Sequence, residues 1–179
     1  MRYWNLQRGF SLIEMIVAVS VLAVVTAVAV PSFVNSQKTA SVESRSAKLL
    51  TVLEVGQTES VKRHREIYVY YKPVKDGNDG CIGLSEKPNK NDFTCLNNEG
   101  LQKLLFTSDD SITVQAPVVT ETTKLFYFSS VNGLPSSNKT VKLAFGSETG
   151  DESGVMIRQY TGLKGCSNTS YRGWEACPS

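Results

Sequence analysis

The sequence reads RGFSLIEMIVAVSVLAVVTAVAVP over residues 8–31, and this stretch sets the fold of the N-terminal part of the chain. From Phe10 to Val30 the residues are almost all apolar. About 20 apolar residues in an α-helix are long enough to cross the hydrocarbon layer of a bilayer. Arg8 adds a positive charge on the N-terminal side, which is typical of a cytoplasmic flank. The stretch therefore predicts one membrane-spanning helix.

Glu14 is the single ionisable residue inside this apolar run. A carboxylate in the hydrocarbon layer costs about 3 kcal/mol or more unless it is neutralised, so such a residue usually marks a functional site that has a partner. The nearest candidate partner is a terminal amine, which would form if the chain were cut just ahead of Phe10. Gly9 occupies the position before that cut.

The run GFSLIE, from Gly9 to Glu14, resembles the leader junction of type IV pilins and type II secretion pseudopilins. In that family a prepilin peptidase cuts after the glycine on the cytoplasmic side and methylates the new N-terminal residue. The resemblance implies a cleaved leader of residues 1–9, an N-methylated Phe10, and a Glu14 that pairs with the terminal amine of a neighbouring subunit in the fibre. Pro31 adds to the resemblance, because many type IV pilins have a proline near this point, where a helix kinks or loosens.

Two other readings of the N-terminus explain less. An ordinary secretory signal places its apolar core before the cut, whereas here the apolar core follows the candidate cut and would be retained. A plain single-pass anchor explains the hydrophobicity and the basic flank, but not Gly9 or Glu14. The intramembrane carboxylate therefore favours the pilin-like interpretation over a plain anchor.

Beyond the spanning segment about 150 residues remain, which is enough for one compact domain and too few for two ordinary ones. The formal net charge of +2 depends on Arg2 and Arg8 in the leader, and without them the chain has 17 basic and 17 acidic residues. A neutral mature chain has no general attraction to nucleic acid or to an anionic membrane. Any such contact would need a local patch of charge.

All four cysteines, Cys81, Cys95, Cys166 and Cys177, follow the membrane segment. An even number on the exported side favours disulfides. Metal binding is the alternative, but the chain has no C-x-x-C, its one histidine is His64, and the spacings match no zinc motif. Three pairings exist, and we favour Cys81 with Cys95 and Cys166 with Cys177, because each closes a short loop rich in turn-forming residues. Each bond would stabilise the fold by about 3 kcal/mol in the chain-entropy model.

After Pro31 apolar residues continue at steps of three, four, seven or eight, which predicts an amphipathic helix with one buried stripe. We expect one helix over residues 11–65, with a membrane-spanning half and an amphipathic half. Its basic end is interpreted as a solvated final turn, where cations offset the helix dipole. His64 is not expected to be catalytic, because the sequence offers no plausible nucleophile or partner group to act with it. The predicted stripe consists of Val42, Leu49, Leu50, Leu53 and Val61.

After the helix the pattern changes to short β-strands, which are predicted at residues 67–74, 112–116, 124–130, 141–145 and 155–160. Turn-rich segments separate them at residues 75–83 and 133–139. A short helix over residues 98–106 is predicted from the spacing of Leu101, Leu104 and Leu105. The expected fold class is α+β, the pilin fold, in which the transmembrane and stalk helix (residues 10–66) packs on an antiparallel β-sheet head (residues 67–179).

A narrower resemblance covers residues 47–73, AKLLTVLEVGQTESVKRHREIYVYYKP. They are similar to the segment that joins helix and first strand in the GspH/FimT family of minor pilins and pseudopilins. Residues 155–158, VMIR, and 160–164, YTGLK, resemble that family's last strand and Gly-Arg turn. Major pilins usually have less of this helix-end signature and a single closing disulfide loop, so a minor subunit is preferred.

Competence-associated members of that family bind DNA through basic residues in a Gly-Arg-x-Arg turn near the C-terminus. The matching turn here, GLKG at residues 162–165, has one cation where two are expected, and phosphate affinity rises with the number of cations. The surrounding composition suits base stacking and phosphate contact. Packing of the aromatic residues onto the head is nevertheless favoured, because the mature chain is neutral. The candidate residues are Lys164, Arg172, Tyr171 and Trp174, with Tyr160 beside them.

No enzyme, cofactor or metal is expected, because the sequence contains no nucleophile–base pair, paired-carboxylate site, phosphate loop or metal cluster. The predicted function is that of a minor type IV pilin, a structural subunit that helps to initiate or cap a pilus. The alternatives are a DNA-binding minor pilin for DNA uptake in natural transformation, and an H-like type II secretion pseudopilin. The expected partners are the prepilin peptidase, other pilins or pseudopilins in a helical fibre, the inner membrane and, in the first alternative, DNA.

The expected location changes with assembly. Before assembly the chain is a single-pass inner-membrane protein with its head in the periplasm. After assembly it lies in a pilus or a pseudopilus.

Overall fold

The structure is a computed structural model that describes residues 10–75, 79–95, 101–107, 112–145, 152–169 and 173–178. Within these ranges a long helix is followed by eight strands and one short 3-10 helix. The chain divides into two compact units, residues 1–38 and residues 39–179. The elements in chain order are α1 (Leu12–Lys62), β1 (Ile67–Lys72), β2 (Gly80–Ser85), η1 (Lys90–Asp92), β3 (Lys103–Phe106), β4 (Ile112–Ala116), β5 (Thr123–Phe128), β6 (Lys139–Phe145), β7 (Ser153–Arg158) and β8 (Gly162–Ser167).

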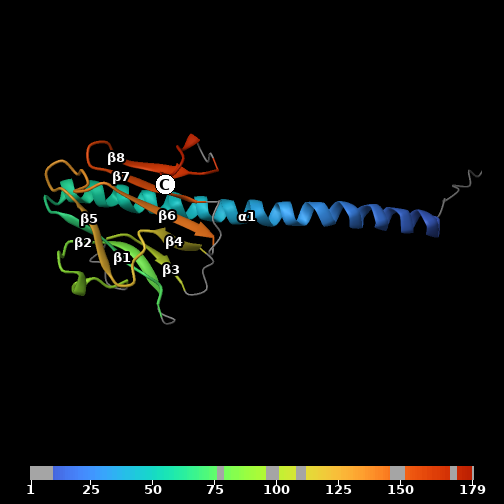
Figure 1. Cartoon of the computed structure of the whole chain (residues 1–179), viewed down its shortest axis with the longest axis horizontal. Helices are drawn as coiled ribbons and strands as arrows, with labels where there is room; N and C mark the ends of the chain where they lie inside the picture. Colours follow the sequence, from blue (N-terminus) through green and yellow to red (C-terminus); the bar gives the residue numbers. More distant parts are fainter. Residues whose placement is uncertain are drawn as a thin grey trace, which may run out of the picture. The chain divides into compact units, whose positions relative to one another are not determined.

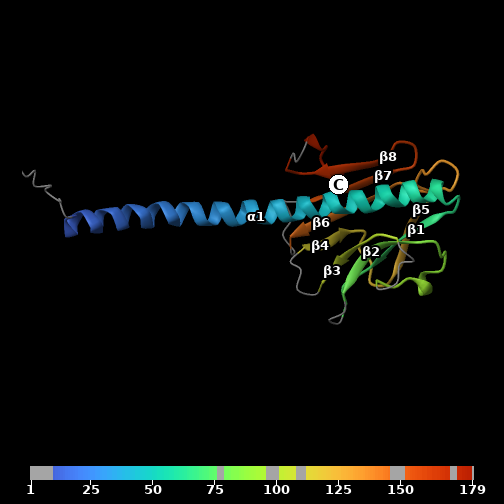
Figure 2. The ribbon, with the colours of Figure 1, turned by 180° about the vertical axis from the view of Figure 1, so that it is seen from behind.

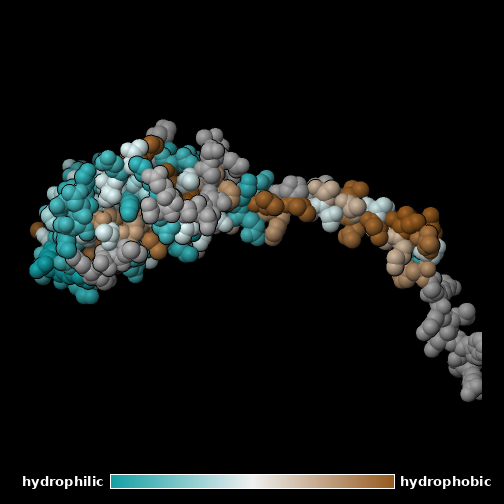
Figure 3. Space-filling view, turned by 90° about the horizontal axis from the view of Figure 1, so that it is seen from below, coloured by the Kyte–Doolittle hydropathy of each residue, from teal (hydrophilic) through white to brown (hydrophobic). Residues whose placement is uncertain are grey.

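The described part of the first unit is the N-terminal half of α1, and its surface is apolar. Its large apolar side chains are all exposed among those that the structure describes, from Phe10 at 80 % to Val34 at 46 %. Figure 3 shows these side chains in brown along the helix. The hydroxyls of Ser20 and Thr26 donate to the carbonyls of Val17 and Leu22 within the helix, so they need no water. By length and composition this helix could cross a membrane.

The second unit contains two antiparallel sheets of four strands, where the sequence predicts a single sheet. Their strand orders are β3-β2-β1-β5 and β4-β6-β7-β8. Both sheets lie alongside the second half of α1 in two opposite views (Figures 1 and 2). One core therefore forms between helix and sheets, and it includes Val42, Leu49, Val52 and Leu53 from α1.

The buried stripe of α1 agrees with the prediction except at two positions. Leu50 is half-buried and packs against the core, while Val61, in the last turn of the helix, is 40 % exposed. Val52 is buried although it lies outside the predicted stripe. Gly56 lets the helix approach the sheet closely, since a Cβ there would lie 2.8 Å from Cδ2 of Leu84.

Helix α1 ends in a Schellman motif. The amide of Arg65 donates to the carbonyl of Ser60 (3.2 Å), and the amide of His64 donates to that of Val61 (3.3 Å). His64 occupies the left-handed position with φ of 53°, where glycine is usual. His64 therefore has a backbone role at the end of the helix.

The basic end of the helix is more than a solvated turn. Arg63 forms ion pairs with Glu59 (2.5 Å) and with Glu86 (2.7 Å), which follows β2. Hydrogen bonds from Arg63 and then from Lys62 lower the pKa of Glu59. The charges therefore tie the helix end to the first sheet.

The predicted strands correspond to β1, β4, β5, β6 and β7, and three further strands were not predicted. The helix predicted over residues 98–106 is wrong: residues 103–106 form β3, and residues 98–100 lie outside the described residues. In β3, Leu104 and Phe106 are buried while Leu105 is 40 % exposed, which is strand alternation. The predicted turn over residues 75–83 is wrong from Gly80 onward, where β2 begins. Residues 162–165, predicted as a turn, lie in β8.

Candidate functional site

The first candidate site lies at the start of α1. Glu14 is in the first helical turn, one turn beyond Phe10, which is 80 % exposed. A carboxylate in this turn is favoured by the positive end of the helix dipole. Glu14 has no hydrogen-bond or ion-pair partner among the residues that the structure describes, so its carboxylate is available to a group outside them. Gly9, the predicted cleavage position, lies outside the described residues.

Two disulfides join the cysteine pairs that the sequence analysis favours. Cys81 in β2 bonds to Cys95, with the two sulfurs 2.03 Å apart. Both cysteines are buried in a small cluster with Tyr70 and Phe93, whose rings stack at a centroid distance of 5.0 Å. This bond ties the segment that carries η1 to β2.

The second disulfide, Cys166 to Cys177, fixes the C-terminal tail along the edge of β8. The amide of Ser167 donates to the carbonyl of Glu175 (2.8 Å), which extends the sheet by one short bridge. A side chain at Gly165 would overlap the indole ring of Trp174, so this ring lies directly against the strand backbone. The tail thus covers a sheet edge that would otherwise present unpaired backbone groups.

The candidate DNA-binding residues lie in or beside this C-terminal tail and β8. Lys164 is exposed on β8, but Trp174 is partly buried against Gly165, which removes part of its ring from any stacking surface. Tyr171 and Arg172 lie outside the described residues. Tyr160 is 85 % exposed in the turn between β7 and β8. Because successive side chains of a strand point to opposite faces, the Lys164 side chain lies on the other face of β8 from the indole ring of Trp174, so the structure does not bring these two candidates together.

The strand register places a second cation beside Lys164. Met156 pairs with Lys164 and Arg158 pairs with Gly162, so Arg158 and Lys164 are diagonal neighbours on one face, about 7 to 8 Å apart. Arg158 donates weakly to the carbonyls of Lys139 (3.4 Å) and Ile157 (3.3 Å). Sequence reasoning missed Arg158, because it treated residues 162–165 as a turn rather than as a strand paired with β7.

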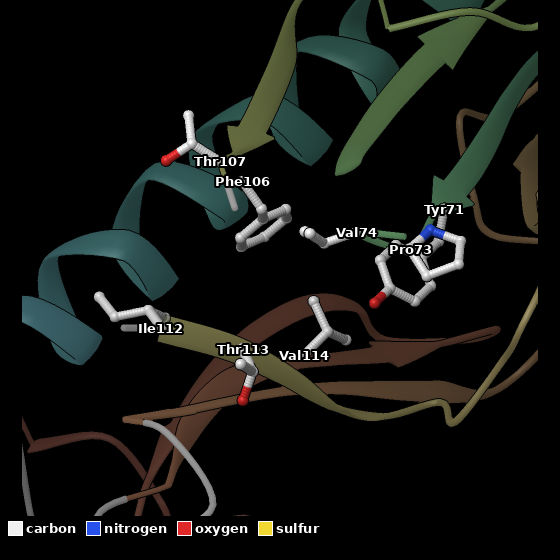
Figure 4. A pocket seen from close by; sticks show the side chains of 8 residues that line it. All are labelled: Tyr71, Pro73, Val74, Phe106, Thr107, Ile112, Thr113 and Val114. Atoms are coloured by element: carbon white, nitrogen blue, oxygen red, sulfur yellow. The ribbon is translucent and has the colours of Figure 1, made fainter. Parts of the chain in front are cut away.

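An apolar pocket of about 230 Å³ lies where β1, β3 and β4 come together. Figure 4 shows the side chains of Phe106, Val74 and Val114 directed into it. Tyr71 also lines the pocket, and burial raises the pKa of its hydroxyl. The described residues contain no cluster of three or more His, Cys, Asp or Glu side chains that could hold a metal ion. The polar side chains that line the pocket are the hydroxyls of Tyr71, Thr107 and Thr113.

Comparison with known proteins gives a match at the N-terminus. The family model described as the prokaryotic N-terminal methylation motif matches residues 4–30, which contain Gly9, Phe10 and Glu14. The match supports the type IV pilin and pseudopilin family and implies processing by a prepilin peptidase. It ends before the head, so it does not identify a GspH/FimT member. Searches of curated proteins and of solved structures found no significant match.

Proposed function

We propose that this chain is a minor type IV pilin, a structural subunit that helps to initiate or cap a pilus. The observation that carries the proposal is the exposed apolar half of α1 with its single carboxylate, Glu14, in the matched methylation motif. A fibre of packed helices would cover this apolar surface after the subunit leaves the membrane. The second half of the same helix forms part of the head's core, so assembly of the helices would carry the head into the fibre.

Processing would create the group that neutralises Glu14. Cleavage after Gly9 frees an amine on Phe10, and methylation leaves that amine able to carry a positive charge. In the proposed fibre this amine pairs with the Glu14 carboxylate of a neighbouring subunit, which removes an unpaired charge from an apolar environment. The prepilin peptidase and other pilins are thus the first partners.

The test is the mass of the chain isolated from membranes and from sheared fibres. Wild-type protein should begin at N-methylated Phe10, whereas Gly9→Val should keep the leader and remain in the inner membrane. Gln7→Ala, a leader change away from the junction, is the control and should be processed normally. An intact leader on protein within fibres would overturn the proposal. Loss of surface pili in a deletion strain, with normal protein secretion, would support a pilus over a secretion pseudopilus.

DNA binding is the second candidate function, and the diagonal pair of Arg158 and Lys164 favours it. Two neutralised phosphates would give a slope of about −1.8 for the logarithm of the affinity against that of the salt concentration. Such binding would be weak in physiological salt. It would account for DNA capture only if other subunits or other cations, including Arg172, contribute.

Duplex DNA binding by the full chain in detergent tests this candidate. Arg158→Gln with Lys164→Gln should abolish the binding and flatten the salt slope, because two phosphate contacts are lost. The fold should persist, since Lys164 is exposed and the half-buried Arg158 makes only two long bonds to carbonyls. Lys48→Gln with Lys90→Gln removes the same amount of charge from two exposed positions elsewhere and is the control for net charge. Equal binding by the two double variants would exclude the pair as a DNA site.

A further inference from the structure

A second pocket, of about 350 Å³, lies at the end of the head where α1 stops. Three separate segments form it: the turn after the helix, the end of β5 with the turn that follows, and the turn between β7 and β8. In Figures 1 and 2 these segments meet at the end of the head where α1 terminates. The volume is at the small end of the range for ligand pockets, about 300 to 1,000 Å³, and suits a ligand of one or two sugar rings.

The lining combines aromatic rings with polar side chains. Its rings are Tyr127 and Tyr160, and its polar members include Glu66, Asn132, Ser136 and Gln159. Three of these groups have no hydrogen-bond partner among the described residues: the side-chain amide of Gln159 and the hydroxyls of Tyr127 and Tyr160. These groups can form hydrogen bonds with several hydroxyl groups of one small ligand, since side-chain amides and hydroxyls both donate and accept.

Glu66 is held in place but keeps an unused oxygen. The hydroxyl of Tyr68 donates to Oε2 of Glu66 at 2.5 Å, and this bond is the main cause that raises the pKa of Tyr68 to about 12. Oε1 of Glu66 accepts no hydrogen bond from a described residue. The pocket therefore presents a fixed acceptor beside the tyrosine rings.

Hydrogen bonds hold the lining segment that follows β5 against the end of that strand. The backbone amide of Tyr127 donates to Oγ of Ser136 (3.1 Å), and the backbone amide of Ser136 donates to the carbonyl of Tyr127 (2.8 Å). The backbone amide of Gln159 donates to Oδ1 of Asn138 (2.8 Å), which fixes the turn between β7 and β8. A preformed site loses little conformational entropy when it binds a ligand.

We propose that this pocket binds a neutral saccharide. The apolar C–H face of a sugar ring can lie on a tyrosine ring, while its hydroxyls bond to Gln159 and Glu66. A quaternary ammonium group is the competing ligand, because it too prefers aromatic faces next to a carboxylate. The mostly polar lining favours the saccharide, since a cation cage gains its strength from the exclusion of water by apolar rings. Binding needs neither processing nor assembly, so it stands apart from the proposed pilin function.

The experiment uses the full chain in a polyoxyethylene detergent, which presents neither a sugar nor a quaternary ammonium headgroup. Lactose, maltose, cellobiose and chitobiose are the probes, and saturation-transfer NMR detects their binding. At least one disaccharide should bind, and Tyr160→Ala and Gln159→Ala should each weaken that binding about tenfold. Tyr160 is 85 % exposed, so its removal should leave the melting temperature unchanged.

Val118→Ala is the matched control, because Val118 is 87 % exposed and does not line the pocket. It should bind like the wild type. The proposal is overturned if none of the four disaccharides binds, or if binding persists in both pocket variants. It is also overturned if choline competes with the bound disaccharide at lower concentration, because the pocket would then be a cation site.

Discussion

Glu14 carries the largest consequence of any single side chain described. It is a lone carboxylate on an exposed apolar helix face, and it has no partner among the described residues. Glu14→Ala should insert into the membrane more favourably, by about 3 kcal/mol, because no charge has to be buried. The same variant should enter fibres poorly, because the neighbouring amine of Phe10 would then lack its counter-charge.

Fractionation of membranes and sheared fibres, followed by immunoblotting, checks this prediction. Ser20→Ala is a suitable control, because it also removes a polar side chain from the apolar half of α1 but leaves Glu14 in place. Normal fibre levels of the Glu14 variant would mean that the carboxylate has no part in assembly.

His64 illustrates a residue whose backbone matters more than its imidazole. It holds the left-handed position of the Schellman motif, which costs a non-glycine residue about 1 kcal/mol. His64→Gly should therefore raise the free energy of unfolding by about 0.5 kcal/mol, since glycine's extra freedom in the unfolded chain cancels part of the gain. The change in the free energy of unfolding is measured by thermal unfolding of the full chain in detergent, monitored by near-UV circular dichroism.

His64→Ala is the comparison for that experiment, because it removes the imidazole but keeps the unfavourable φ. It should be no more stable than the wild type. If the alanine variant gained as much stability as the glycine variant, the imidazole and not the backbone would be the source of strain.

The elements that could be predicted from the sequence are those with local signals. Helix α1 shows an apolar run and then a helical stripe, β4 and β6 show alternating runs, β1 and β5 runs rich in aromatic residues, and β7 an apolar run. The candidate N-terminal site could also be predicted from the sequence, because Gly9, Phe10 and Glu14 fall within six consecutive residues. In each case the decisive residues are neighbours in the chain.

The elements that were missed depend on distant contacts. Every residue of β2 is buried, because Ile82 and Leu84 pack in the main core on one face and Cys81 packs in the small cluster with Tyr70 and Phe93 on the other. A strand that is covered on both faces need not alternate. The leucines of β3 fit a helix equally well until their pairing with β2 is known. In β8, Gly165 signals a turn, but it is the site where Trp174 packs. The Arg158–Lys164 pair and the polar pocket likewise exist only through strand register and turn placement.

The covered edge of β8 yields a prediction about the second disulfide. Non-reducing peptide mapping should link Cys81 to Cys95 and Cys166 to Cys177. Cys166→Ser with Cys177→Ser should destabilise the head by about 3 kcal/mol and free the tail from the strand. The amide of Ser167, which donates to Glu175, should then exchange its hydrogen much faster.

Cys81→Ser with Cys95→Ser is the matched control. It removes a disulfide of similar loop length but leaves the tail attached, so exchange at Ser167 should stay close to that of the wild type. Free thiols, or a link between the two regions of the wild-type chain, would contradict the pairing itself.

The two units of the chain differ in the polarity of their surfaces. The exposed apolar residues are concentrated in the first unit, whereas the core of the second unit is made from residues 42–163 and includes α1 from Val42 onward. A fragment of residues 39–179 should therefore fold and stay in the aqueous phase, while the full chain should partition into detergent. Cloud-point phase separation with a detergent, together with near-UV circular dichroism, measures both properties.

The fragment also tests whether the head depends on the membrane helix. Cooperative melting at a temperature close to that of the full chain would show that the second unit is complete in itself. Precipitation of the fragment, or a loss of its near-UV signal, would show that the first 38 residues contribute to the core.

The order of the cysteines has a consequence for biogenesis. Each disulfide joins cysteines that follow one another in the chain, and the two loops are neither nested nor crossed. During export in the proposed topology, Cys81 and Cys95 emerge together, well before Cys166 and Cys177. An oxidase that simply joins thiols as they appear would therefore produce the native bonds at once, with no need for the slow reshuffling that an isomerase catalyses. Maturation of this subunit should depend on the oxidase and be indifferent to loss of the isomerase.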